Sequence, residues 1–229
     1  MVVKKTRVFL IRFKNEISFK DVQKLRGAIM NRVTQHDQIL FHNHDGDSFR
    51  YSYPLILYKR IQKKAAVLCI NEGADVIGEF LSANSFEVIL GDRNVVLEVE
   101  TIFPKISIVQ TWDSVFKYRI NNWLALNSIN YKQYTAMEGI AEKTLFLEKI
   151  LIGNLLSFAK GVGIEVKDEI LCKLISVEPY RLAVVKGVKM MSFNAVFSTN
   201  MSIPDYIGLG KHVSIGYGTV TKIYDDNSN

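Results

Sequence analysis

The sequence predicts an α+β protein made of two tandem ferredoxin-like domains. The first half reads as strand, helix, strand, strand, helix, strand, which is the order of that fold. The second half repeats this order loosely, without a clear repeat of the sequence itself. Hydrophobic residues make up 48% of the 229 residues and charged residues 23%, which is the balance of a chain with a real core. We place the domain boundary near residue 110, which gives domains at 1–110 and 111–229.

The first domain is expected to open with a strand at 6–13, because this segment is rich in β-branched and aromatic residues. A helix should follow at 19–33, with Ser18 as its N-cap. Its apolar face, with residues three and four apart, consists of Val22, Leu25, Ile29 and Val33. A strand is expected at 49–61, and Pro54 within it places that strand at an edge or a bulge. The remaining elements are expected at 65–70, 74–81, 86–90 and 95–101, with the last two strands on either side of a turn at 91–94. This is one strand more than the ferredoxin-like order contains, and the extra strand is an unexplained addition.

A long amphipathic helix is the main element expected in the second domain. It should span 135–160, and Gly161 and Gly163 should end it. Its apolar stripe is expected to consist of Ile140, Leu147, Leu151, Leu155 and Phe158. Strands are expected at 116–124, 170–177, 181–188, 189–197 and 219–224.

Charge and cysteine content narrow the class of protein. The net charge of +6 and the pI of about 9.2 favour an anionic partner such as RNA, DNA or a membrane surface. Cys69 and Cys172 lie in apolar runs, which is typical of core residues in a reducing compartment. The most apolar segment, 144–159, contains Glu148 and Lys149, so it predicts a buried helix and no membrane span. We therefore expect a cytoplasmic protein without a membrane partner.

Three of the four histidines fall within nine residues: His36, His42 and His44. Histidine has a side-chain pKa near physiological pH, so two neighbouring imidazoles can act as a base and an acid. This pairing suits cleavage of RNA by its own 2′-hydroxyl, which needs no metal ion because the nucleophile is already attached. Tyr51 and Tyr53 are close enough in sequence to orient the phosphate or assist proton transfer.

Two other interpretations of the histidine segment stay open. It is a solvated polar loop, or it binds zinc or manganese through His42 and His44 with Asp45 or Asp47. An H-x-H pair on an extended segment does place both rings on one side. No further cluster of ligands follows elsewhere in the sequence, so we expect no metal and no other cofactor.

A glycine-rich segment at 207–218 is the second candidate site. It contains Gly208, Gly210, Gly216 and Gly218, with Lys211 and His212 between the two pairs. Glycines let backbone N–H groups approach phosphate oxygens closely, and Lys211 adds positive charge. The segment fits neither a Walker A loop nor the dinucleotide-binding G-x-G-x-x-G pattern. The alternative is a hairpin that merely turns.

The third candidate is the basic run 59–64, which contains Lys59, Arg60, Lys63 and Lys64. Such a run is usually the solvated tip of a hairpin. As a functional feature, it would supply phosphate contacts that do not depend on RNA sequence.

Two of these segments together resemble the CRISPR-associated endoribonucleases of the repeat-associated mysterious protein superfamily. The segment 207–218 is similar to that superfamily's glycine loop, with Tyr217 in place of a phenylalanine. The segment Phe41, His42, Asn43, His44, followed by Tyr51, Ser52, Tyr53, Pro54, is similar to the subtype with a paired-histidine loop. The resemblance spans the whole chain and implies the same tandem ferredoxin-like fold.

The resemblance implies an enzyme that binds CRISPR repeat RNA and cuts it without metal, leaving a 5′-hydroxyl and a 2′,3′-cyclic phosphate. His42 and His44 would be the catalytic pair with Tyr51 assisting, although Tyr53 is equally suited, and His36 is taken as structural. With the basic run included, the residues expected to bind RNA are Lys59, Arg60, Lys63, Gly208, Gly210, Lys211, His212, Gly216 and Gly218.

Other functions make different predictions. A non-catalytic RNA-binding subunit of a CRISPR effector complex would bind RNA in a salt-sensitive way and release no product. A metal-dependent nuclease using the His/Asp loop would lose activity in a chelator. Membership of an effector complex and a homodimer both stay open as partners.

Overall fold

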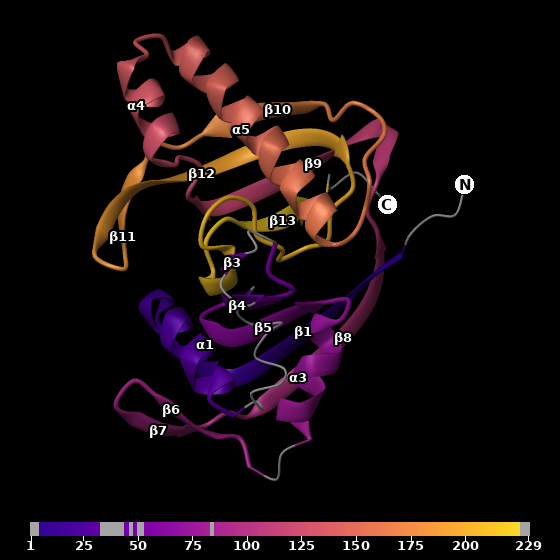
Figure 1. Ribbon diagram of the computed structural model, residues 1–229, viewed down its shortest axis with the longest axis vertical. Helices are drawn as coiled ribbons and strands as arrows, with labels where there is room; N and C mark the ends of the chain where they lie inside the picture. Colours follow the sequence, from indigo (N-terminus) through magenta and orange to yellow (C-terminus); the bar gives the residue numbers. More distant parts are fainter. Residues whose placement is uncertain (1–4, 33–43, 46–47, 50–52, 83–84, 225–229) are drawn as a thin grey trace. The chain divides into compact units, whose positions relative to one another are not determined.

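The computed structural model of the chain describes residues 5–32, 44–45, 48–49, 53–82 and 85–224 (Figure 1). The chain divides into two units. The first comprises Met1–Ile108 together with Ser214–Gly216, and the second comprises Val109–Val213 together with Tyr217–Asn229. Both units are α+β, as expected.

The first unit is built on a four-stranded antiparallel sheet with the strand order β4-β5-β1-β8. These strands are β1 (Lys5–Glu16), β4 (Ile56–Ile61), β5 (Lys64–Ile70) and β8 (Val99–Ile108). Helix α1 (Val22–Met30) packs on β4, and helix α3 (Gly73–Leu81) packs on β5 and β1. Along the chain the order is β1, α1, β4, β5, α3, β8, which confirms the ferredoxin-like arrangement.

Helix α1 follows from a local capping signal and an apolar stripe. The carboxylate of Asp21 accepts hydrogen bonds from the hydroxyl of Ser18 at 2.8 Å and from its backbone N–H at 3.3 Å. A single 3-10 turn, η1 (Phe19–Asp21), comes first, so the α-helix begins three residues later than expected. Val22, Leu25 and Ile29 of the predicted face are fully buried. Val33 lies outside the described residues.

Two strand predictions in this unit are wrong in part. The strand expected at 49–61 is interrupted: the short β3 (Ser48–Phe49) ends before Pro54, and β4 begins after it. Proline has no N–H to donate to a ladder, so the strand starts beyond it, and β4 does lie at the sheet edge as expected. The strand expected at 95–101 is divided between β8 and a separate hairpin, β6 (Glu87–Leu90) with β7 (Arg93–Val96).

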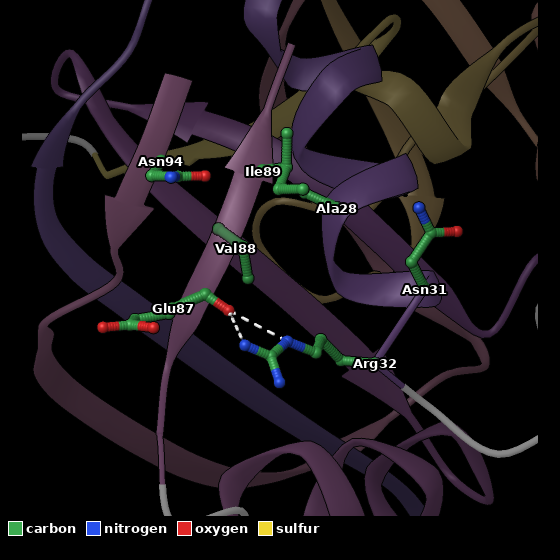
Figure 2. Close-up of a pocket in the computed structure, with 7 residues that line it drawn as sticks. All are labelled: Ala28, Asn31, Arg32, Glu87, Val88, Ile89 and Asn94. Atoms are coloured by element: carbon green, nitrogen blue, oxygen red, sulfur yellow. Dashed lines mark hydrogen bonds between the residues drawn. The ribbon is translucent and has the colours of Figure 1, made fainter. Parts of the chain in front are cut away.

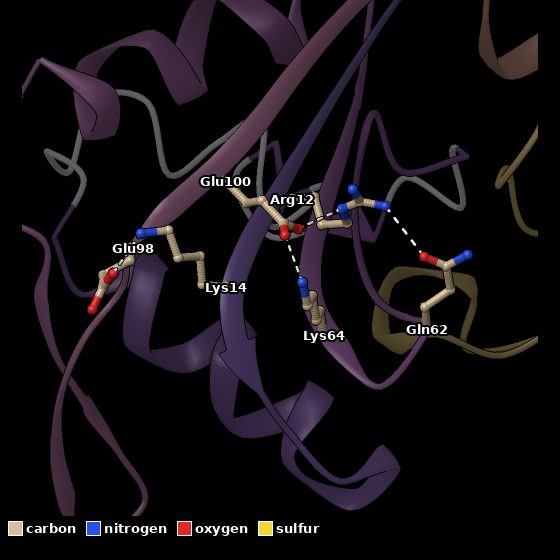
Figure 3. Close-up of polar contacts among 6 residues, drawn as sticks. All are labelled: Arg12, Lys14, Gln62, Lys64, Glu98 and Glu100. Carbon is tan, nitrogen blue, oxygen red and sulfur yellow. Dashed lines mark hydrogen bonds and ion pairs between the residues drawn. The ribbon is translucent and has the colours of Figure 1, made fainter.

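Ion pairs join side chains on or beside β1, β5 and β8 (Figure 3). The carboxylate of Glu100 accepts from Nε of Arg12 at 2.7 Å and from Nζ of Lys64 at 2.5 Å. The hydrogen bond from Lys64, opposed by some desolvation and aided by Arg12, holds the pKa of Glu100 below its usual value. Lys14 pairs with Glu98 at 3.1 Å. Arg12, Lys14 and Lys64 are therefore paired with carboxylates of the same unit.

The second unit has an antiparallel sheet with the order β10-β12-β9-β13, and β11 pairs with β12. Its strands are β9 (Thr111–Trp123), β10 (Cys172–Val177), β11 (Arg181–Val185), β12 (Val188–Met201) and β13 (Thr219–Ile223). The strand order matches that of the first unit, so the second ferredoxin-like sheet is also confirmed. Between β12 and β13 the glycine-rich segment and the short η2 (Val213–Ile215) stand where that fold has its second helix.

The long helix expected at 135–160 is two helices. Helix α4 (Ser128–Ala136) and helix α5 (Ile140–Gly161) are separated by three residues, and Gly139 is the N-cap of α5. The predicted stripe is buried except for Ile140, which is 84% exposed at the first position of α5. Among the described residues, no helix combines the length and apolar character that crossing a membrane requires.

The core of the second unit contains aromatic residues and one carboxylate. Tyr118 stacks on Phe197 with 5.5 Å between ring centroids. The buried side chain of Glu148 on α5 accepts from the backbone N–H of Leu174 at 2.9 Å and contacts Nζ of Lys173 at 3.4 Å. These bonds satisfy the buried charge and tie α5 to β10.

Candidate functional site

The histidine segment lies mostly outside the described residues. His36, His42 and Tyr51 fall outside them, and His44 begins the short strand β2 (His44–Asp45). Strand β2 pairs antiparallel with β3, with His44 opposite Phe49. The backbone of His44 is therefore part of a hairpin, whereas the grouping of the predicted catalytic residues stays a prediction.

The alternatives for this segment are placed no more completely. The metal-site interpretation needs His42 and Asp47, and both lie outside the described residues. Among the residues that the structure does describe, no group of three or more His, Cys, Asp or Glu side chains could hold a metal ion. Tyr53, the alternative third group, is buried with 9% of its surface exposed.

The basic run forms the end of β4, a two-residue turn and the start of β5. Gln62 and Lys63 make the turn with φ of 49° and 69°. Arg60 is exposed and donates from Nε to the carbonyl of Ile17 at 2.7 Å, and Lys63 is exposed. The interpretation of the whole run as a solvated hairpin tip is wrong for Lys59, whose side chain is fully buried on β4. Two of the three basic side chains predicted to bind RNA here thus reach the surface.

Burial lowers the pKa of Lys59 from 10.5 to about 7. Between these two values the unfolded chain binds more protons than the folded chain, so the free energy of unfolding should rise with pH. We expect Lys59→Met to flatten this rise, because methionine carries no group that titrates in this range. Urea denaturation between about pH 7 and pH 9 measures the slope. The exposed Lys63→Met serves as the control, and an unchanged slope in Lys59→Met would contradict the assignment.

The glycine-rich segment is folded tightly against β9 and β13. Gly208 forms a bridge with Thr219, and the N–H of Leu209 donates to the carbonyl of Gly218 at 2.9 Å. The N–H of Gly218 donates to Asn122 at 3.0 Å, and that of Lys211 donates to Leu124 at 3.1 Å. Several amides expected to face a phosphate are thus used within the protein.

Two glycines are required by the backbone itself. Gly210 has φ of +95°, and a Cβ placed on it would lie 2.8 Å from Cδ1 of Trp123. Gly218 has φ of +60°, and a Cβ there would overlap the carbonyl oxygen of Leu209. Both values lie in the left-handed region, which side chains other than glycine rarely adopt. These glycines shape the loop, and their part in RNA binding stays a prediction.

The loop presents two side chains that suit a phosphate. Lys211 is exposed, and His212 is half-buried with its ring centroid 6.4 Å from that of Tyr217. Burial lowers the pKa of His212, and the positive charges of Lys186 and Lys211 lower it further. The imidazole of His212 is therefore neutral at physiological pH, where it can both donate and accept a hydrogen bond.

The tip of the loop belongs to the first unit and brings in a residue that the sequence analysis missed. Nη1 of Arg26 on α1 donates to the hydroxyl of Ser214 at 3.4 Å. A Cβ on Gly216 would approach Val22 and Phe19 at 3.4 Å. Arg26 lies beside the apolar stripe of α1. The helical pattern that predicts this stripe gives no signal that Arg26 contacts Ser214, which is far away in the sequence.

Comparison with known families accounts for both halves of the chain. The model of the Cas6b N-terminal domain matches residues 4–106, and the model of the Cas6b C-terminal domain matches residues 110–223. The chain belongs to the Cas6b family. The resemblance to CRISPR-associated endoribonucleases is thereby confirmed at the level of the family.

Solved structures agree with this Cas6b assignment. A crystal structure of Cas6b is 28% identical with a TM-score of 0.86, and covers 96% of this chain and 100% of that chain. A crystal structure of the CRISPR RNA processing endoribonuclease Cas6b is 25% identical with a TM-score of 0.73 and the same coverage. A Cas6-related protein from Pyrococcus furiosus, 16% identical with a TM-score of 0.52, covers 97% of this chain and 100% of that chain and shares the fold.

One relative is similar by sequence to slightly less than half of this Cas6b-family chain. An uncharacterized protein of Methanocaldococcus jannaschii is 37% identical over 112 residues, which are 48% of this chain and 75% of that protein.

Proposed function

We propose that the chain is an endoribonuclease that cuts CRISPR repeat RNA without a metal ion. One observation carries the proposal: both halves match the Cas6b domain models in order, and a similar structure is that of a CRISPR RNA processing endoribonuclease. The net charge of +6 and the exposed Lys211 on the glycine loop support an RNA partner.

The proposed reaction is an attack of the RNA on its own backbone. One histidine of the pair His42 and His44 removes the proton of the 2′-hydroxyl, and the 2′-oxygen bonds to the adjacent phosphorus. The bond from phosphorus to the 5′-oxygen breaks, and the other histidine protonates that oxygen. The products are a 2′,3′-cyclic phosphate and a 5′-hydroxyl. Tyr51 is proposed to orient the phosphate.

The described residues support the RNA-binding part of this scheme unequally. Lys211, Arg60 and Lys63 are exposed cations, which suit contacts with the phosphate backbone. His212 offers a neutral imidazole beside Lys211. Lys59 is buried, so it does not offer its ammonium group to an RNA on the surface.

The deciding experiment is a cleavage assay with the repeat RNA of the protein's own genome in excess EDTA. A second substrate carries a single 2′-deoxynucleotide at the cut site, which removes only the nucleophile. We expect one cut that persists in EDTA, is blocked by the deoxy substitution, and leaves a cyclic phosphate detectable by mass spectrometry. Binding without a cut would instead identify a non-catalytic subunit of an effector complex. Cleavage only with added metal would overturn the proposed mechanism.

A further inference from the structure

A pocket of about 460 Å³ lies in the first unit between the C-terminal end of α1 and the hairpin β6–β7 (Figure 2). Buried Ala28 and Val88 give it an apolar floor. Asn31, Arg32 and Asn94, all exposed, give it a polar rim. A volume in this range with a few polar groups is typical of a site for a small molecule or a part of a larger one.

The guanidinium of Arg32 is held in a fixed orientation at the rim. Its Nε and Nη2 both donate to the backbone carbonyl of Glu87, at 2.9 Å and 2.5 Å (Figure 2). A guanidinium held in this way keeps its planar face available for stacking and its other N–H groups available as donors.

The register of the hairpin determines which backbone groups of β6 face this pocket. Leu90 pairs with Arg93 across a two-residue turn, and the closing pair of such a turn is hydrogen-bonded. The N–H of Leu97 donates to the carbonyl of Phe86 at 2.9 Å, which fits the same alternation. The residues between these bonded positions therefore direct their N–H and C=O groups away from β7.

Glu87 and Ile89 are the two residues of β6 whose backbone groups point away from β7. The carbonyl of Glu87 accepts from Arg32, and its N–H donates to the hydroxyl of Ser85 at 3.2 Å. Ile89 lines the pocket, and its N–H and C=O lie on the same edge of β6 as those of Glu87. This edge of β6 thus presents one adjacent donor and acceptor to the pocket.

We propose that the pocket binds one unpaired nucleobase of the repeat RNA; this rests on the function proposed above. The base edge would pair with the N–H and C=O of Ile89, because every base has adjacent donors and acceptors on its Watson–Crick edge. Its faces would contact the apolar floor and the guanidinium plane of Arg32. An added peptide strand would need a longer run of edge groups than Ile89 alone offers, since those of Glu87 are already bonded.

The test combines abasic RNA with a backbone substitution. Ile89→Pro removes the outward N–H without removing a ladder hydrogen bond. Val96→Pro is the matched control, because Val96 pairs with Glu87 and its N–H lies on the opposite edge of the hairpin. Asn31→Ala is a second variant that leaves the hairpin unchanged. Thermal unfolding of each full-length variant establishes that it is folded.

Binding is measured by titration with intact repeat RNA and with RNAs that lack one base at each position in turn. We expect one position at which loss of the base weakens binding to the native chain about tenfold. Ile89→Pro and Asn31→Ala should weaken binding of intact RNA. In these two variants, removing the base at that one position should cost less affinity than it costs the native chain. Val96→Pro should behave as the native chain does. Free nucleoside monophosphates should not compete at millimolar concentration.

Three outcomes would overturn this inference. The first is that Ile89→Pro and Asn31→Ala both bind intact RNA with native affinity. The second is that the loss of affinity caused by either substitution adds to the loss caused by the missing base at every abasic position. The third is that free nucleoside monophosphates compete with the RNA at millimolar concentration or below. If the native chain cuts the repeat RNA but shows one of these results, only the pocket assignment fails. If the native chain neither binds nor cuts the RNA, the proposed function fails first.

Discussion

We expect His44→Ala to lower the single-turnover rate of repeat RNA cleavage by about 10²–10⁴-fold, because it removes one of the two groups that transfer protons. The affinity for RNA should stay within about twofold, since phosphate contacts and not the imidazole supply most of the binding energy. A quenched-flow cleavage assay and a binding titration with the same RNA measure the two quantities. The same effect is expected for His42→Ala.

A control variant and a modified substrate test which histidine is the acid and which is the base. Asn43→Ala, between the two histidines, should cleave at the native rate. A substrate with sulfur in place of the 5′-oxygen at the cut site has a leaving group that needs no proton. The variant whose rate it restores has lost the acid, and the other has lost the base. Native activity in His44→Ala would remove this residue from the mechanism.

Gly218→Ala is expected to destabilise the second unit by about 2–4 kcal/mol. Its Cβ would overlap the carbonyl oxygen of Leu209, and the φ of +60° is costly for alanine. The hydrogen bonds that Gly218 makes with Leu209 and Asn122 hold the loop on β9. Urea denaturation followed by tryptophan fluorescence measures the loss, because Trp123 lies beside this loop at Gly210.

Gly153→Ala is the matched control for this substitution. Gly153 lies within α5, and a Cβ on it would meet nothing within 4 Å. Alanine there should stabilise the helix by about 0.5–1 kcal/mol. Two Gly→Ala changes with opposite signs would separate the geometry of the loop from the general cost of glycine. Native stability in Gly218→Ala would show that the loop accommodates a side chain.

The fold was predictable where one local signal determined each element. The stripe of Val22, Leu25 and Ile29 fixed the buried face of α1, and the strand order of both sheets followed from the alternation of elements. The joined helix at 135–160 was wrong because its apolar stripe begins only at Ile140, so no periodicity supports the residues before it. Met137 and Gly139 both have extended backbone, and they separate α4 from α5.

Side-chain burial was less predictable than backbone structure. Lys59 belongs to a run of basic residues, and sequence composition alone places such a run in solvent. The strand period of two does distinguish the faces of β4, but β4 is buried on both faces except at Arg60, so alternation gives no warning. The pocket beside α1 was not predictable either: strands were expected at 86–90 and 95–101, but the pocket depends on how α1 packs against this hairpin.

The first unit combines two segments that lie far apart in the sequence, and this affects how it folds during synthesis. Three of its residues, Ser214–Gly216, are separated from the rest by more than a hundred positions of the chain. A ribosome therefore has to synthesise residues 109–213 before this unit has all of its parts. A fragment ending at Ile108 lacks them altogether, so a nascent chain can complete the first unit only after most of the second unit's residues have been added.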